Sequence, residues 1–195
     1  MSINLTKGNG ISLKKEAPSL KKLHVGLGWT IPNGNPAVDI DVCAFGLDLS
    51  SGRPLLKRED YFVYFNNLAT KDGAIKHTGD NRTGAGAGDD ESILVDLSNI
   101  ASDVGEIAFI VTIYNDGPVY TFKDVTDAYI RLVDDNDGRE IARYSLNENF
   151  GSNLAVQFGS LTRKADDASS WDFTAIGAGY NVGLGDILAQ YGQNV

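Results

Sequence analysis

The sequence predicts an all-β protein, a β-sandwich of two mainly antiparallel sheets with one or two short helices, including a short C-terminal helix. In many short segments, apolar and polar residues alternate with the period of a strand. Turn-forming residues separate these segments about every dozen residues. The 195 residues are 42% hydrophobic, and no proline-rich or glycine- and serine-rich linker divides them. This composition predicts a single domain over residues 1–195, large enough to bury a core.

The first half of the chain predicts five strands. They are expected at residues 3–5, 11–13, 23–29, 38–44 and 61–65. The first two flank Lys7-Gly8-Asn9-Gly10 and are interpreted as a hairpin, because glycines tolerate the dihedral angles of a tight turn. In 23–29 and 38–44, apolar residues recur at every second position. The segment 61–65 is rich in aromatic residues, which favour strands.

The second half predicts further strands and both helices. Strands are expected at residues 93–97, 106–114, 129–133, 140–145, 154–158, 161–163 and 171–175. The most apolar of these, 106–114, is expected in the interior of a sheet. The acidic segment 134–138 ends in glycine and is interpreted as a tight hairpin turn. A short helix is predicted at 122–128, and apolar residues at helical spacing predict another at 183–191.

The most unusual stretch runs from Gly79 to Glu91 and combines glycines with carboxylates. Glycines at 84, 86 and 88 allow positive φ angles, so that backbone carbonyls can turn inward. Asp80 at one end and the triplet Asp89-Asp90-Glu91 at the other supply charged oxygens. Ligand sets made only of oxygen suit a hard cation, calcium first. The alternative is a solvated, glycine-rich surface loop.

Other loop types do not fit this stretch. A phosphate-binding loop needs a lysine and a following helix, whereas here three carboxylates follow the last glycine. The glycine spacing is not that of a dinucleotide-binding fingerprint. An EF-hand counted from Asp80 would place Arg82 and Gly84 at positions that need oxygen ligands.

Two more carboxylates are predicted to lie together on the strand 38–44. Asp39 and Asp41 are two positions apart, so they share one face and stand roughly 6.5–7 Å apart. That separation allows both to line one metal site or two adjacent sites, although an outward polar face would show the same pattern. Asn66 follows the strand 61–65, where its amide oxygen could bind a metal or cap a turn.

Composition limits the partners. The net charge of −9 argues against nucleic acid and anionic membranes, which need a basic patch, and favours cations. The single cysteine, Cys43, cannot form an intrachain disulfide and is interpreted as a small buried hydrophobic residue. The N-terminus does not resemble a signal peptide and no segment has the length of a membrane span, so a cytoplasmic location is expected.

The stretch Gly-Asp-Asn-Arg-Thr-Gly-Ala-Gly-Ala-Gly-Asp-Asp-Glu at residues 79–91 resembles the signature loop of the TerD family, which is named for tellurite resistance. Further similar pieces extend over nearly the whole chain: residues 27–29, 39–41, 62–66, 111–114, 142–144 with 146–148, and 177–180. The resemblance implies a calcium-binding β-sandwich associated with bacterial stress responses, with no established catalytic activity. Family members often carry acids between the loop glycines, where this chain has Ala85 and Ala87.

These observations lead to three functional hypotheses. In the first, two neighbouring calcium ions are held at one end of the sandwich. The ligand candidates are Asp39, Asp41, Asn66, Asp80, Asn81, Gly84, Gly86, Gly88, Asp89, Asp90, Glu91 and Glu148. In the second, the same carboxylates hold a metal with an open coordination position in a hydrolase. In the third, compatible with the first, calcium orders a surface that docks other stress-response proteins.

Overall fold

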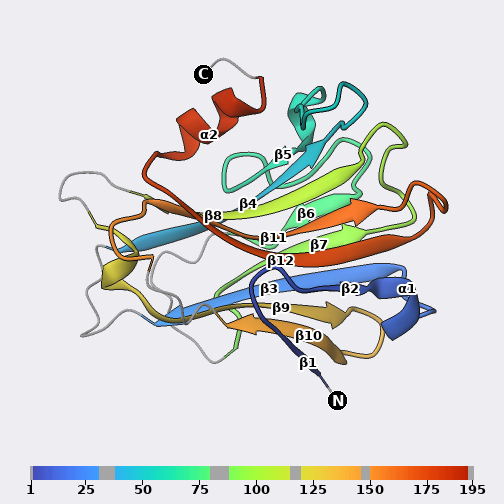
Figure 1. The fold of residues 1–195 in the computed structure, drawn as a ribbon, viewed down its shortest axis with the longest axis horizontal. Coiled ribbons are helices and arrows are strands. Elements are labelled where there is room, and N and C mark those ends of the chain that lie inside the picture. The colour runs from blue at the N-terminus through green and yellow to red at the C-terminus, as the bar shows by residue number, and fades with distance from the viewer. Residues whose placement is uncertain (1, 31–37, 80–87, 115–119, 146–149, 193–195) are drawn as a thin grey trace.

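The computed structural model describes residues 2–30, 38–79, 88–114, 120–145 and 150–192. In this part of the chain, two six-stranded sheets form the layers of a sandwich, which confirms the predicted fold class (Figure 1). Sheet A has the order β1 (Ile3–Leu5), β10 (Glu140–Ser145), β9 (Thr126–Asp134), β3 (Lys22–Thr30), β7 (Glu91–Asp96), β6 (Ile75–His77). Sheet B has the order β2 (Gly10–Ser12), β12 (Trp171–Tyr180), β11 (Ala155–Arg163), β8 (Glu106–Tyr114), β4 (Asp39–Leu47), β5 (Phe62–Val63). Every pair of neighbours is antiparallel except β1 and β10, which are parallel.

The core lies between the sheets and follows the predicted alternation. In β3, the odd-numbered residues from Leu23 to Trp29 are buried hydrophobic side chains, and His24, Gly26 and Gly28 occupy the opposite, outer face of sheet A. The strand β8, predicted to be interior, lies between β11 and β4. Both faces of β8 are buried, so apolar residues occupy nearly every position and the sequence of β8 does not alternate between apolar and polar residues.

The predicted C-terminal helix is confirmed as α2 (Leu184–Gln190), which packs on sheet B (Figure 1). The ring of Tyr191, just after the helix, lies 5.2 Å from the ring of Phe45 in β4, measured between centroids. The N–H of Leu56 also donates to the carbonyl of Tyr191 at 2.9 Å. These contacts explain why β4 is buried on both faces. In the described residues, no helix has the length and hydrophobicity that a membrane span requires.

The predicted N-terminal hairpin is wrong. β1 pairs with β10 in sheet A, whereas β2 pairs with β12 in sheet B, so the turn between them crosses from one sheet to the other. The second strand also ends before Leu13, where α1 (Leu13–Glu16) begins. The glycines at the turn were correctly recognised, but a turn does not specify that its flanking segments pair with each other.

Three other expectations need correction. The segment 61–65 contains only the two strand residues of β5, preceded by a 3₁₀ turn at Glu59–Tyr61. The helix expected at 122–128 is a 3₁₀ turn at Phe122–Asp124, after which β9 begins. The strands expected at 154–158 and 161–163 are one strand, β11, with an irregular register between Gln157 and Gly159. The hairpin turn at 134–138 is confirmed by Gly138, whose φ is +72°.

One end of the sandwich, which we call the Glu91 end, carries most of the predicted ligands that lie in the described residues. β7 begins at Glu91, which pairs with Leu27 near the end of β3, and β4 begins at Asp39, which pairs with Tyr114 at the end of β8. The backbone N–H of Val42 in sheet B donates to the carboxylate of Glu91 in sheet A at 2.7 Å. This bond places the beginnings of β4 and β7 side by side.

The opposite end, which we call the Arg163 end, is held by one arginine. The guanidinium of Arg163 donates to four backbone carbonyls: those of Ile100, Ala101 and Val104 between β7 and β8, and that of Ala168 between β11 and β12. It also lies 4.4 Å from the centre of a ring of Trp171. One side chain therefore fastens together two connections from different parts of the sequence.

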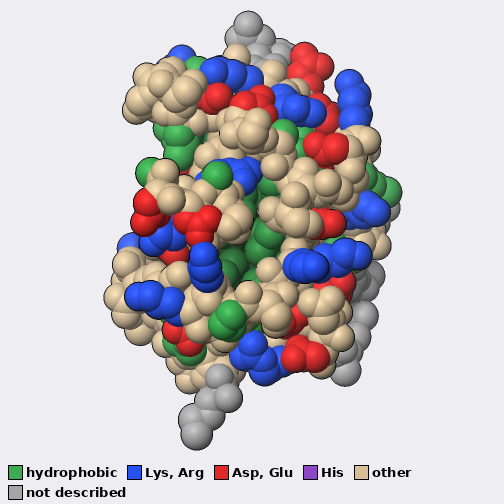
Figure 2. Space-filling view, turned by 90° about the vertical axis from the view of Figure 1, so that its right-hand side faces the viewer, with side chains coloured by type: hydrophobic (Ala, Val, Ile, Leu, Met, Phe, Trp, Pro, Cys, Tyr) green, Lys and Arg blue, Asp and Glu red, His purple; other side chains and the backbone are tan. Residues whose placement is uncertain are grey.

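Figure 2 faces this second end and shows basic and acidic side chains around a hollow with a hydrophobic floor. A cavity of about 110 Å³ lies beside α1, with walls that include Leu13, Leu20, Leu97 and Trp171. Leu20 precedes β3 and Leu97 follows β7, so the cavity is separated from the Glu91 end by the length of these strands. The predicted ligands of β4 and at the start of β7 therefore lie at the opposite end of the sandwich from this cavity.

Candidate functional site

Three consecutive carboxylates lead into β7, and the structure directs each to a different place. Asp89 lies on the outer face of sheet A against β9, Asp90 lies at the end of β3, and Glu91 lies between the two sheets. Successive side chains near a strand point to opposite faces, which separates neighbours in the sequence. The three adjacent side chains therefore contact different partners, although their charges still influence one another.

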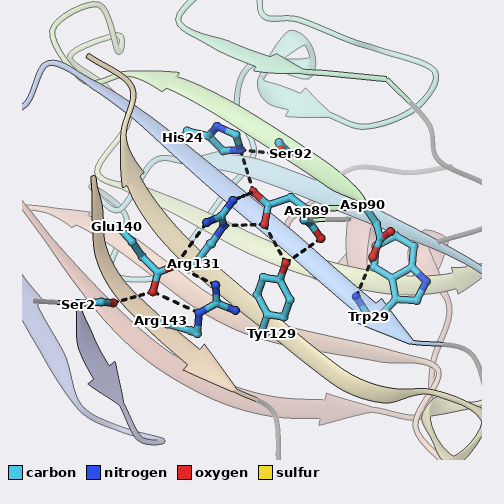
Figure 3. A network of polar contacts seen from close by, with 11 residues as sticks. Ser2, His24, Trp29, Asp89, Asp90, Ser92, Tyr129, Arg131, Glu140 and Arg143 are labelled. Atoms are coloured by element: carbon cyan, nitrogen blue, oxygen red, sulfur yellow. Dashed lines mark hydrogen bonds and ion pairs between the residues drawn. The ribbon is translucent and has the colours of Figure 1, made fainter. Parts of the chain in front are cut away.

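Asp89 is bound on all sides by partners from sheet A (Figure 3). Its Oδ1 accepts hydrogen bonds from Arg131 Nε at 2.7 Å and from the hydroxyl of Tyr129 at 3.1 Å. Its Oδ2 accepts from Arg131 Nη2 at 2.9 Å and lies 3.3 Å from His24 Nε2. Burial raises the pKa of the Asp89 carboxyl, but the bonds from His24 and Arg131 and the charge of Arg131 outweigh it and lower the pKa to about 2.

A second layer of charges supports Arg131. Its Nη1 lies 3.4 Å from Glu140, whose carboxylate also accepts from Arg143 at 2.8 Å and from the hydroxyl of Ser2 at 2.7 Å. Arg143 in turn lies over the ring of Tyr129, 4.1 Å from its centre. The hydrogen bond from Arg143 lowers the pKa of the Glu140 carboxyl and outweighs its burial. The network thus joins β7, β9, β10 and the N-terminus on one face, as Figure 3 shows.

Two glycines of β3 provide the floor of this network. A Cβ atom on Gly26 would overlap the carboxylate of Asp89, and a Cβ atom on Gly28 would overlap the ring of Tyr129. Glycine in a strand interior normally weakens it, so its presence at both positions reflects the close approach of other groups. The sequence of β3 is thus adapted to the side chains that lie on it.

Asp90 caps the end of β3. Its Oδ2 accepts from the backbone N–H of Trp29 at 2.9 Å, and its own N–H donates to the carbonyl of Leu27 at 2.7 Å. Burial raises the pKa of the Asp90 carboxyl, and the charges of Asp89 and Glu91 raise it further, against the opposing effect of the Trp29 N–H. Its ionised form would be favoured by a positive charge placed beside it.

Glu91 is buried, with 1% of its surface exposed, and replaces a missing strand partner. β5 is short, and its last residue, Val63, pairs with Ala44 of β4. The N–H of Val42 points to the same edge of β4 but lies past the end of β5. It donates to the carboxylate of Glu91 instead of to a neighbouring strand. Nε2 of His77 lies 3.5 Å from the same carboxylate oxygen. Because Nδ1 of His77 accepts the N–H of Gly79 at 3.0 Å, we assign its proton to Nε2, facing Glu91.

Asp39 and Asp41 share the face of β4 that carries Phe45, as their spacing predicts. Asp41 is buried and pairs in register with Thr112 of β8. Burial raises the pKa of the neighbouring Cys43 thiol, and the charges of Asp41 and Glu91 raise it further. Asp41 and Glu91 therefore both lie near Cys43, which is fully buried as predicted.

The remaining predicted ligands are divided. Asn66 is exposed at the tip of a turn between Tyr64 and Asn67, and Gly88 is exposed with a φ of +109°. Outside the described residues lie Asp80, Asn81, Gly84, Gly86 and Glu148. Within the described ranges, no group of three or more histidine, cysteine or carboxylate side chains is arranged to hold a metal ion. A metal at the Glu91 end would therefore need oxygens from beyond these ranges.

Comparison with known proteins adds a family to this geometry. A family model described as the TerD domain matches residues 1–191. The chain belongs to the TerD family. This confirms the resemblance found in the acidic loop and the segments around it.

Relatives of this TerD-family chain are similar along their entire length. The tellurium resistance protein TerD of Serratia marcescens is 43% identical, and the alignment covers 100% of this chain and 99% of that protein. General stress protein 16U of Bacillus subtilis (strain 168) is 37% identical, with 100% of both chains covered. A crystal structure of a homologue of telluride resistance protein (TerD) from Streptomyces coelicolor A3(2) has a TM-score of 0.70 and 25% identity, covering 91% of this chain and 100% of that one. Proteins named for tellurium resistance and for general stress therefore share this family.

Sequence reasoning missed the partners of Asp89 in this TerD-family chain. Arg131 and Tyr129 occupy alternate positions of β9, as exposed polar residues of a half-buried strand do. The available signal was in β3, where Gly26 and Gly28 alternate with buried residues and mark a close approach from the outer face.

The buried Glu91 of this TerD-family chain leads to a stability prediction. Glu91→Ala is expected to lower the free energy of unfolding by about 2–4 kcal/mol, because it leaves the Val42 N–H buried without an acceptor and opens a cavity. Glu91→Gln keeps an acceptor oxygen and is expected to cost less than the alanine variant. Urea denaturation measures both. Glu16→Ala, at an exposed glutamate, is the control and should stay within about 0.5 kcal/mol of the wild type. Equal effects at the two positions would contradict the assigned role of Glu91.

Proposed function

We propose that this protein binds calcium at the Glu91 end, as two neighbouring ions, and that calcium orders a surface there that docks other stress-response proteins. The observation that carries this proposal is the hydrogen bond between Val42 and Glu91, which joins the two sheets where the strands bearing Asp41 and Glu91 begin. Carboxylates from separated segments are thereby brought to one end, next to the exit of the acidic loop.

The donor chemistry fits calcium. Calcium takes about six to eight oxygen ligands at flexible geometry. The described residues offer carboxylates at Asp39, Asp41, Asp90 and Glu91, with two of them buried. The rest of the shell is proposed to come from Asp80, Asn81 and Glu148 and from the carbonyls of Gly84, Gly86 and Gly88. Burial and like charges raise the pKa of Asp90, and a bound dication would offset both effects.

The stress-response part of the proposal is supported by the family. Its members include proteins named for tellurium resistance and for stress responses, and the names reported above do not describe enzymes. A calcium-ordered surface is a means by which a protein of this kind can act without catalysis. In the described residues, the hydroxyl of Ser92 lies 2.8 Å from Nε2 of His24, and the same ring nitrogen lies 3.3 Å from Asp89. A catalytic triad uses the two different ring nitrogens for the nucleophile and the carboxylate, so this arrangement favours ion binding by oxygens over nucleophilic catalysis.

Isothermal titration of the chelator-treated protein tests the calcium site. We expect binding of two calcium ions, and we expect Asp90→Asn to lower the affinity of at least one by about tenfold or more, because a charged oxygen is lost. Asp135→Asn is the matched control, since it removes the same charge from the exposed hairpin turn between β9 and β10. No binding heat at millimolar calcium would overturn the proposal, and equal losses in the two variants would show that the site is elsewhere.

A further inference from the structure

Asp89 was predicted from the sequence to bind calcium together with Asp90 and Glu91, and in the structure its carboxylate is surrounded by partners from β3 and β9. Each of its oxygens already has two partners: Arg131 and Tyr129 on Oδ1, and Arg131 and His24 on Oδ2. Only 6% of its side chain is exposed. A calcium ion could reach this carboxylate only by displacing a guanidinium that binds it through two parallel bonds, an arrangement among the strongest ion pairs in proteins.

The charge around Asp89 also opposes a cation. The guanidinium of Arg131 is a permanent positive charge in contact with the carboxylate, and it would repel a dication bound to the same oxygens. Arg131 is restrained on its other side by Glu140, which lies 3.4 Å from its Nη1. The neighbouring Tyr129 is also held in place, because Arg143 lies over its ring. Asp90 differs, since two of its near neighbours are the carboxylates of Asp89 and Glu91.

The same network fixes the backbone on both sides of Asp89. Before it, the carbonyl of Gly88 lies 2.9 Å from the hydroxyl of Tyr129 and shares its proton with Asp89. Gly88 has a φ of +109°, which few other residues tolerate. After it, the N–H of Asp90 donates to Leu27 at 2.7 Å. The exit of the acidic loop is thereby attached to both β9 and β3.

We propose that Asp89 is a positioning residue and not a calcium ligand: through Arg131 and Tyr129 it fastens the loop exit to the outer face of sheet A and holds Asp90 and Glu91 where the cation will bind. This inference rests on the proposed calcium site. It assigns the three adjacent carboxylates different tasks, with Asp89 paired to an internal cation and the next two directed to the Glu91 end. Gly26 and Gly28 contribute to this attachment, because the absence of a side chain at these positions leaves room for Asp89 and Tyr129.

A double-mutant cycle on the metal-free protein tests the anchor itself. Asp89→Asn, Arg131→Met and the double variant are unfolded with urea in the presence of a chelator. We expect the pair to be coupled by about tenfold or more in the unfolding equilibrium constant, because the groups share two short bonds in a partly buried site. The exposed pair Lys14 and Asp167, 2.6 Å apart, provides the control cycle with Lys14→Met and Asp167→Asn, and should show a smaller coupling. Coupling within twofold for Asp89 and Arg131 would overturn the anchor.

Calcium titration of the same variants distinguishes a positioning role of Asp89 from a role as ligand. The deciding quantity is whether Arg131→Met weakens or strengthens calcium binding. If Asp89 positions the loop exit, Arg131→Met weakens calcium binding about tenfold or more, as does Asp89→Asn, because either change releases the supporting contacts. If Asp89 is instead a ligand, Arg131→Met removes a competing cation and leaves calcium binding unchanged or tighter, while Asp89→Asn alone weakens it. That second pattern would overturn the proposal.

Arg131→Lys provides a conservative variant that stays closer to the wild-type fold. It keeps the positive charge but cannot make the two parallel bonds, so we expect it to recover only part of the lost calcium affinity. Full recovery would contradict the role given to the paired bonds. If the wild-type protein binds no calcium, the proposed function fails, whereas the metal-free cycle still decides whether Asp89 and Arg131 form the anchor.

Discussion

Replacing Arg163 by methionine is expected to lower the free energy of unfolding by about 3 kcal/mol or more, one of the largest effects of any single substitution in the described structure. The guanidinium donates four hydrogen bonds to backbone carbonyls of two connections, at 2.7–3.2 Å. Hydrogen bonds from charged groups each contribute about 1.5–3 kcal/mol, and carbonyls left buried without a donor add a penalty. Methionine keeps an apolar side chain over Trp171, so that the loss comes mainly from the bonds.

The matched control for this prediction is Arg53→Met. Arg53 is exposed, and its replacement removes the same charge from the protein while staying within about 0.5 kcal/mol of the wild type. Equilibrium unfolding in urea, with the slope against denaturant compared between variants, measures both changes. If Arg163→Met were as mild as Arg53→Met, the connections at the Arg163 end would not depend on this side chain.

Calcium is expected to raise the melting temperature of the chelator-treated protein by about 5–11 °C for one site at a free ion concentration about a hundred times its dissociation constant. At that ratio, a ligand that binds only the folded chain adds roughly 2.7 kcal/mol, and each kcal/mol shifts the midpoint of a domain this large by roughly 2–4 °C. Two independent sites should give about twice the shift. Differential scanning calorimetry measures it directly.

Magnesium provides the comparison for the calcium result. Its small octahedral shell loses water reluctantly, so an equal concentration should shift the midpoint only slightly. A magnesium shift as large as that of calcium would favour the open, hydrolase-like site considered from the sequence. No shift with either ion would support the alternative of a solvated loop.

The alternation of apolar residues was sufficient to predict the fold class and the strands β3 and β4, but the ten-residue β12 was predicted only over residues 171–175. It failed for the N-terminal hairpin, because turn residues signal a reversal of the chain but do not specify the partners of the strands. β1 finds Ala142 and β2 finds Asp172, and these pairings depend on sheet edges that are built far along the chain.

The candidate site shows the same limit for side chains. Residue type predicted that the acidic loop would matter, but it did not predict that Asp89 would bind Arg131, 42 positions later in the sequence. It also did not predict that Glu91 would accept the N–H of a strand in the other sheet. Both outcomes depend on which strands become neighbours. The calcium ligands themselves stay a prediction.

The attachment of β1 and β2 to different sheets has a consequence for the order of synthesis. β1 and β2 are synthesised well before their partners β10 and β12, which begin at residues 140 and 171. Until then the emerging chain has two short edge segments without neighbours, and both sheets are incomplete. Contacts between the two ends of the sequence slow folding, since a long loop must close before they form. The two sheets can therefore be completed only after β10 and β12 have been synthesised.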